Sequence, residues 1–162
     1  MRLHPVPGAH GHHARRTRRT RRTRPTRRDR VQRCGGGYTT SGVLTQLDDP
    51  KVSSRVAQAD VVEVEVGAND VGYDPSCGPS VGCYEPTIPT LEHNLGAIVA
   101  RVRDLTQGRR VLLVLVDYWS VWLGGQYAQA QGTACVEGAA EITDQVNAVI
   151  KDAAARTGAA YV

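Results

Sequence analysis

The stretch VVEVEVGAND, residues 61–70, decides the fold of this chain. Its first six residues, VVEVEV, are a valine followed by valine and glutamate in alternation, and this pattern predicts a β-strand. A glycine ends the strand, and an asparagine and an aspartate follow directly. Because ligands of open α/β sheets bind beyond the carboxyl ends of the strands, Asn69 and Asp70 are candidate ligand-contacting residues. Glu63 and Glu65 share one face of the strand and argue against burial on both faces.

Helical and extended segments alternate on either side of this stretch. The spacing of apolar residues predicts helices over 39–47, 52–58, 90–107 and 137–157, and further strands over 111–116 and 159–162. Strands separated by helical segments of about twenty residues are typical of parallel βαβ units. The continuous apolar run VLLVLV at 111–116 predicts a parallel strand that is buried on both faces. The expected fold is therefore α/β, a three-layer α/β/α sandwich around a parallel sheet.

Charge is distributed very unevenly along the 162 residues. Residues 1–33 hold twelve arginines and one acidic residue, a net charge of +11, whereas residues 34–162 hold eight basic and fifteen acidic residues, a net charge of −7. The overall charge of +4 is therefore positive only because of the first segment, and the rest of the chain is acidic. This distribution argues against a nucleic-acid-binding function for the chain as a whole.

The N-terminal segment, residues 1–34, contains too few apolar residues to bury a core, and we expect it to be disordered. Its repeated Arg-Arg-Thr would neutralise phosphates, which predicts binding to nucleic acid or an anionic surface. Its histidines at positions 10, 12 and 13 would suit a metal-binding tract. A third interpretation of this segment is a solvated tail without a binding function. We favour another interpretation, a shifted reading frame in a GC-rich gene, and place the folded domain at residues 35–162.

The four cysteines bear on the compartment of the protein. Cys77 and Cys83 bound the short Gly- and Pro-containing loop CGPSVGC, which in a secreted protein favours a local disulfide over two free thiols. The spacing lacks the two-residue gaps of zinc knuckles, so no metal site is expected. Cys34 and Cys135 either pair or stay free. No apolar run long enough for a transmembrane helix and no apolar signal-peptide core occur, so neither is expected.

A glycine-rich loop followed by a helix, GGYTTSGVLTQL at residues 36–47, precedes the strand that ends in GAND. This order, with the helix and strand that follow, resembles the SGNH or GDSL family of esterases and lipases over residues 36–162. The segment ADVVEVEVGANDVGY, residues 59–73, is similar in sequence to that of secreted actinobacterial members. The resemblance implies an SGNH or flavodoxin-like fold, serine-dependent hydrolysis of a small ester or lipid, no cofactor and an extracellular location. We favour a monomer.

The resemblance also implies roles for particular residues. Gly37, with Gly36 as the alternative in register, matches the glycine of the second family block, and Gly67 and Asn69 match the third. In the family these blocks form the oxyanion hole. The residue types suit that chemistry, because a glycine lets a backbone N–H approach a developing oxyanion and a carboxamide donates a hydrogen bond without adding charge.

Two family blocks are absent from these 162 residues. No GDS motif supplies a nucleophilic serine, and no DxxH motif supplies a base. Outside the N-terminal segment the sole histidine is His93, which precedes the strand that the base should follow. The chain thus resembles the middle of such a hydrolase without its first strand and last helix. We expect a fold that is incomplete at both ends and a copy that is inactive.

Three more residues are candidates for contact with a substrate. Asp70 adjoins Asn69, and Asp117 directly follows the strand at 111–116, so both belong to the ligand-binding edge of the sheet. Trp119, with Tyr118 and Trp122, either forms a wall for an acyl or aryl group or packs the loop.

Overall fold

The structure, a computed structural model, describes residues 37–122 and 125–162. The expectations for residues 1–34, including the nucleic-acid, metal-tract and reading-frame interpretations, lie outside these residues. So do Cys34 and Gly36. None of the described helices is long and apolar enough to cross a membrane.

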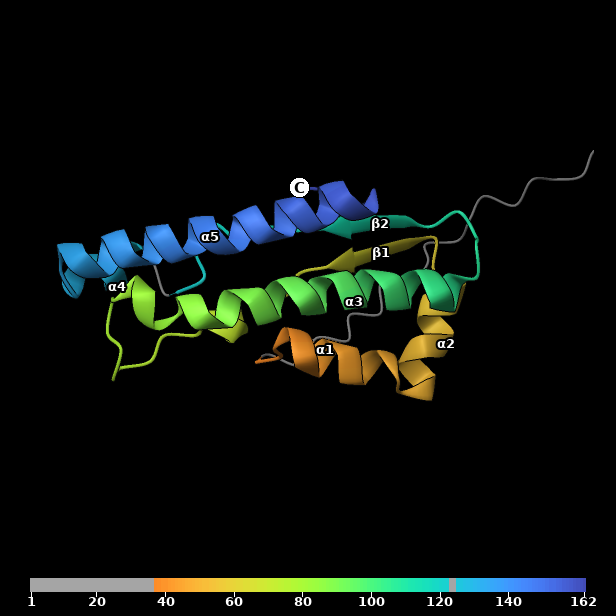
Figure 1. Cartoon of the computed structure of the whole chain (residues 1–162), viewed down its shortest axis with the longest axis horizontal. Helices are drawn as coiled ribbons and strands as arrows, with labels where there is room; N and C mark the ends of the chain where they lie inside the picture. The colour runs from red at the N-terminus through yellow and green to blue at the C-terminus, as the bar shows by residue number, and fades with distance from the viewer. Residues whose placement is uncertain (1–36, 123–124) are drawn as a thin grey trace, which may run out of the picture. The chain divides into compact units, whose positions relative to one another are not determined.

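Helices and strands alternate along the described chain, as predicted (Figure 1). The helices are α1 (Thr40–Leu47), α2 (Pro50–Gln58), α3 (Ile88–Thr106), α4 (Gly125–Ala130) and α5 (Thr133–Thr157). The strands are β1 (Val61–Val64), β2 (Leu112–Leu115) and β3 (Ala160–Tyr161). Short 3-10 turns, η1 (Ala68–Val71), η2 (Val81–Cys83) and η3 (Glu85–Thr87), divide the segment between β1 and α3.

The three strands form one parallel sheet in the order β1-β2-β3, which confirms the predicted parallel βαβ organisation. Val62 is paired with Leu113, and Leu115 with Tyr161. Since the strands are in sequence order and crossovers are right-handed, both connecting helices belong on the same face. Figure 1 shows α3 and α5 side by side, and the two helices contact each other.

The hydrophobic core lies between this helical layer and one face of the sheet. Leu113 and Leu115 of β2 are buried in it. On the opposite face Val61 and Leu112 are 56% and 54% exposed. The prediction that β2 is buried on both faces was therefore wrong for the described residues, because α1 and α2 pack on α3 instead of on the second face of the sheet.

Local capping chemistry sets several helix boundaries that apolar periodicity misses. The Asp49 side chain accepts a hydrogen bond from the Lys51 amide at 2.7 Å, and Pro50 occupies the first position of α2. Both are favourable at a helix start, so α2 begins two residues earlier than predicted. At the other end of α3, Gln107 takes a left-handed conformation with φ 47°, and Gly108 follows with φ 74°. These two residues end the helix.

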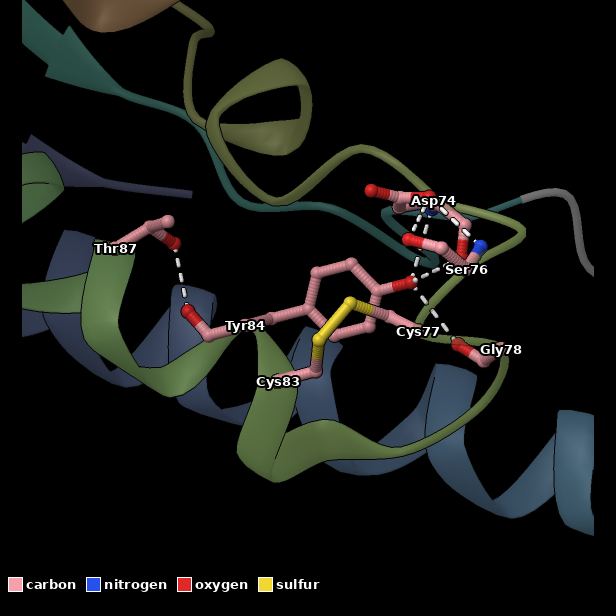
Figure 2. Close-up of a disulfide and its surroundings, with 7 residues drawn as sticks. All are labelled: Asp74, Ser76, Cys77, Gly78, Cys83, Tyr84 and Thr87. Carbon is pink, nitrogen blue, oxygen red and sulfur yellow. Dashed lines mark hydrogen bonds between the residues drawn. A yellow bond between two sulfur atoms is a disulfide. The ribbon is translucent and has the colours of Figure 1, made fainter.

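A disulfide joins Cys77 and Cys83 and closes the loop that leads into α3. Figure 2 shows the Tyr84 ring beside this disulfide. The Tyr84 hydroxyl accepts a hydrogen bond from the Asp74 amide and donates one to the Gly78 carbonyl, both at 2.9 Å. The loop is thus held by a covalent bond and by a buried phenol.

Candidate active site

The Asn69 side chain meets the backbone that follows the glycine loop. Its carboxamide nitrogen donates a hydrogen bond to the Tyr38 carbonyl oxygen at 3.0 Å, although the two residues are 31 positions apart in sequence. Gly37, the residue before Tyr38, has φ +91°, a conformation that favours glycine. The structure therefore brings the Gly37–Tyr38 segment and Asn69 to one place. Asn69 itself is exposed to solvent.

Gly67 makes the turn that presents Asn69. Its φ of +139° is one that L side chains rarely adopt. A Cβ here would lie 3.3 Å from Leu91 Cδ1 and 3.5 Å from Val146 Cγ1, so α3 and α5 also leave little room for a side chain. Glycine allows the backbone to pass between the two helices. The 3-10 turn η1 then buries Val71 and leaves Asn69 on the surface.

Asp70 is bound to the start of α1. Its carboxylate accepts hydrogen bonds from the Thr40 amide at 2.9 Å and from the Thr40 hydroxyl at 2.5 Å. A carboxylate at a helix N-terminus satisfies a free amide and interacts favourably with the helix dipole. Asp70 therefore fixes α1, and with it the preceding Gly37–Tyr38 segment, next to the turn that carries Asn69.

A buried asparagine on α3 completes this network. The Asn94 carboxamide donates hydrogen bonds to the Thr40 hydroxyl at 2.9 Å and to the Ser41 hydroxyl at 3.0 Å. Thr40 is fully buried and Asn94 nearly so. Neither residue is predicted from the sequence to take part in the site. The one available signal was a polar side chain three positions after Leu91, on the apolar stripe of α3.

Tyr118 reaches the same turn from the loop after β2. The Ala68 amide donates a hydrogen bond to its hydroxyl oxygen. The pKa of Tyr118 is raised to about 12, mainly by burial; the Ala68 hydrogen bond opposes this shift, and the charges of Glu65 and Asp70 add to it. The Asn147 side chain accepts from the Tyr118 amide at 3.0 Å and donates to its carbonyl at 2.7 Å, which fixes the tyrosine on α5.

The remaining predicted residues lie in separate surroundings. Asp117 accepts a hydrogen bond from the Tyr161 hydroxyl at 2.8 Å, and this bond raises the pKa of Tyr161. Trp119 is 83% exposed. Trp122 is buried, donates its indole N–H to the Val71 carbonyl at 2.7 Å and packs against the Tyr84 ring, so it has the packing role. Within the described ranges, no hydrogen bond joins Asp117 or Trp119 to Asn69.

No nucleophile and base come together in residues 37–122 and 125–162. His93 is exposed on α3 and has no hydrogen bond to a serine or a carboxylate there. The hydroxyl of Ser41 accepts from Asn94, and that of Ser120 donates to the Trp122 carbonyl at 2.7 Å. The same part of the chain holds no group of three acidic, histidine or cysteine residues able to bind a metal.

The chain belongs to the GDSL-like lipase/acylhydrolase family, whose model matches residues 6–162. The resemblance drawn from the glycine loop and the GAND stretch is thereby confirmed at the family level. No curated protein matches the chain.

Two lipolytic enzymes are among the solved structures that the chain matches. Phospholipase A1 from Streptomyces albidoflavus NA297 is 23% identical with a TM-score of 0.52, over 77% of this chain and 56% of that one. The lipase Lip_vut3 from a goat rumen metagenome is 17% identical with a TM-score of 0.45, over 69% of this chain and 52% of that one. The chain thus spans about half the length of these proteins. At this identity, the phospholipase supports the α/β fold alone.

Proposed function

We propose that this chain carries the oxyanion-stabilising part of a site that hydrolyses carboxylic esters. The observation that carries the proposal is the 3.0 Å contact between the Asn69 carboxamide and the Tyr38 carbonyl, directly after Gly37. It places a side-chain donor next to the backbone of the glycine loop. Membership of the GDSL-like family supports ester hydrolysis as the reaction.

The chemistry of an oxyanion hole fits these groups. A carboxamide has two N–H donors, and Asn69 gives one of them to Tyr38, so the second remains for a ligand oxygen. In this proposal the second N–H and the amide of Gly37 or its neighbour stabilise the negative charge that develops on the ester carbonyl oxygen. Loss of one such donor typically costs about 3 kcal/mol of transition-state stabilisation.

The nucleophile and its base are the parts that these 162 residues do not supply. Ester hydrolysis through an acyl-enzyme needs a hydroxyl activated by a neighbouring base. The sequence contains neither a GDS nor a DxxH motif, and His93 has no serine partner in the described part of the chain. We therefore propose that the 162-residue polypeptide by itself does not turn over esters.

Turnover of p-nitrophenyl butyrate by the purified 162-residue polypeptide and its Asn69→Ala variant tests this function. The expected result is release of p-nitrophenol at the same background rate by both proteins. Robust turnover that Asn69→Ala abolishes would refute the inactivity and support the site. Robust turnover that the substitution leaves unchanged would contradict both parts of the proposal.

We further propose that the protein works in an oxidising compartment outside the cytosol. The Cys77–Cys83 disulfide supports this, because structural disulfides persist in secreted proteins and are rare in reducing cytosol. Maleimide labelling of protein recovered from its own source, unfolded without reduction, checks it. Cys77 and Cys83 should remain unlabelled. Labelling of both would contradict the proposal.

A further inference from the structure

We propose that Asn94, a buried residue of α3, is a positioning residue of the candidate site. Its carboxamide acts on Asn69 through the side chains of Thr40 and Asp70, to which it is linked by hydrogen bonds. The effect on the geometry of Asn69 stands on these contacts alone. The effect on anion binding rests on the proposed function.

Two neighbouring residues of the η1 turn hold the segment before α1 at two points. The Asn69 carboxamide donates to the Tyr38 carbonyl at 3.0 Å. The Asp70 carboxylate accepts the Thr40 amide at 2.9 Å and the Thr40 hydroxyl at 2.5 Å. Because the partners are close in sequence on both segments, the two contacts close one ring. A change at the Asp70 contact therefore alters the geometry of the Asn69 contact.

The Thr40 hydroxyl has one hydrogen, and its partners fix where that hydrogen points. A carboxylate can only accept, so the hydrogen goes to Asp70. The hydroxyl oxygen accepts from its other partner, the Asn94 carboxamide nitrogen, at 2.9 Å. Hydrogen bonds in such a chain polarise and strengthen one another. Asn94 therefore reinforces the bond between Thr40 and Asp70 and holds it in one direction.

The place of Asn94 on α3 suits this role. Leu91 and Ile98, about one turn before and one turn after it, are fully buried in the core. Asn94 also donates to the Ser41 hydroxyl at 3.0 Å, so it contacts the first two residues of α1. Side chains locked by packing and hydrogen bonds are the ones that position a site. Burial of a carboxamide costs free energy that an apolar side chain would not, so packing alone does not explain an asparagine here.

The side-chain N–H signals of Asn69 in NMR spectra give a direct readout, because one of these hydrogens is bonded to Tyr38 and hydrogen bonding shifts its signal. Thr40→Val keeps the shape of the side chain and removes the hydroxyl. It should move the bonded Asn69 signal toward that of a solvent-exposed asparagine. Asn94→Leu should move the signal in the same direction. Thr40→Ser restores the hydroxyl and should restore the signal.

Thr106→Val is the matched control. Thr106 is also buried, lies at the far end of α3, and donates its hydroxyl to the Arg103 carbonyl at 3.0 Å. The same substitution there removes a buried hydroxyl outside the ring, and the Asn69 signals should stay in place. If Asn94→Leu does not fold, the comparison of Thr40→Val with Thr40→Ser decides the inference.

Titration of the same variants with butylphosphonate measures the consequence for anion binding. The affinity should fall about fivefold in Thr40→Val and in Asn94→Leu, because a hydrogen bond that orients the donor is lost. Thr40→Ser should recover the affinity, and Thr106→Val should keep it.

The inference would be overturned by Asn69 signals that Thr40→Val leaves in place, by equal shifts in Thr106→Val, or by a failure of Thr40→Ser to restore them. Equal affinities of all variants for butylphosphonate would overturn it as well. If the signals respond as expected while the unchanged protein binds no butylphosphonate, the positioning role stands and the proposed function falls.

Discussion

Gly67 shows how a single backbone conformation sets the candidate site. It has φ +139°, and the side chains of Leu91 and Val146 crowd the position that a Cβ would take. Strain of this kind costs on the order of 1–3 kcal/mol. We therefore predict that Gly67→Ala lowers the free energy of unfolding by about 2 kcal/mol, measured by urea denaturation.

Gly96 provides the control for this prediction. It lies within α3, and a Cβ there would meet nothing within 4 Å. Gly96→Ala should raise the stability by up to about 1 kcal/mol, because alanine has a higher helix propensity than glycine. Equal effects of the two substitutions would contradict the role given to Gly67.

Tyr118 makes the stability of the fold depend on pH in the alkaline range. Burial raises its pKa from an ordinary value of 10.0 to about 12. A raised pKa means that the unfolded tyrosine ionises first, so the stabilisation is complete below about pH 10 and is lost as the pH rises toward 12. Urea denaturation at pH 9 and pH 11 should show lower stability at pH 11.

The variant Tyr118→Phe isolates this contribution. Its stability should fall less between pH 9 and pH 11 than that of the unchanged protein, since the titrating group is gone. Some decline should persist because hydrogen bonding to Asp117 also raises the pKa of Tyr161. An identical decline in both proteins would refute the assignment to Tyr118.

At the scale of elements, α5 packs against the disulfide loop through a glycine. A Cβ at Gly138 would collide with the backbone carbonyl oxygen of Pro79. Because this neighbour is backbone, it cannot move aside as a flexible side chain would. Gly138→Ala should therefore separate α5 from the loop and lower the free energy of unfolding by about 1–3 kcal/mol.

Gly82 is the matched control in the same loop, since a Cβ there would meet nothing within 4 Å. Thermal unfolding of Gly82→Ala and Gly138→Ala compares the two positions. Only Gly138→Ala should lower the midpoint by several degrees. A midpoint that Gly138→Ala leaves unchanged would show that the close approach of Gly138 to the Pro79 carbonyl does not affect stability.

Local patterns were sufficient to predict the main elements. The apolar stripes of α3 and α5 have the period of a helix, and the continuous apolar run VLLVLV of β2 is typical of a parallel strand. The helix boundaries were less predictable, because the Asp49 cap and the residues at 88–89 and 133–136 carry no apolar period. The exposure of Leu112 depends on which helices cover the sheet, and a strand's own sequence does not encode that.

The candidate site was predictable only in part. The GAND stretch and the glycine loop pointed to Asn69 and Gly37, whose segments the structure brings together. The link from Asp70 through Thr40 to Asn94 joins residues up to 54 positions apart. Such contacts depend on how α1 packs on α3, so no local sequence pattern predicts them.

At the scale of the whole molecule, the sheet and its helical layer serve to bring distant segments to one edge. The parallel order β1-β2-β3 places the ends of β1 and β2 together. Residues that follow β1, such as Asn69, therefore lie near the loop that follows β2 and carries Tyr118. The proposed function requires that this edge of the sheet binds an anion at Asn69.

The most direct test of that claim is a titration with butylphosphonate, a tetrahedral anion, followed through the side-chain amide signals in NMR spectra. The Asn69 signal should shift in a saturable way, and Asn69→Asp should abolish binding by removing the donor and adding a negative charge. Gln58→Glu, the same change at an exposed position of α2, should leave binding intact. An Asn69 signal that does not move, or equal losses in both variants, would contradict the account.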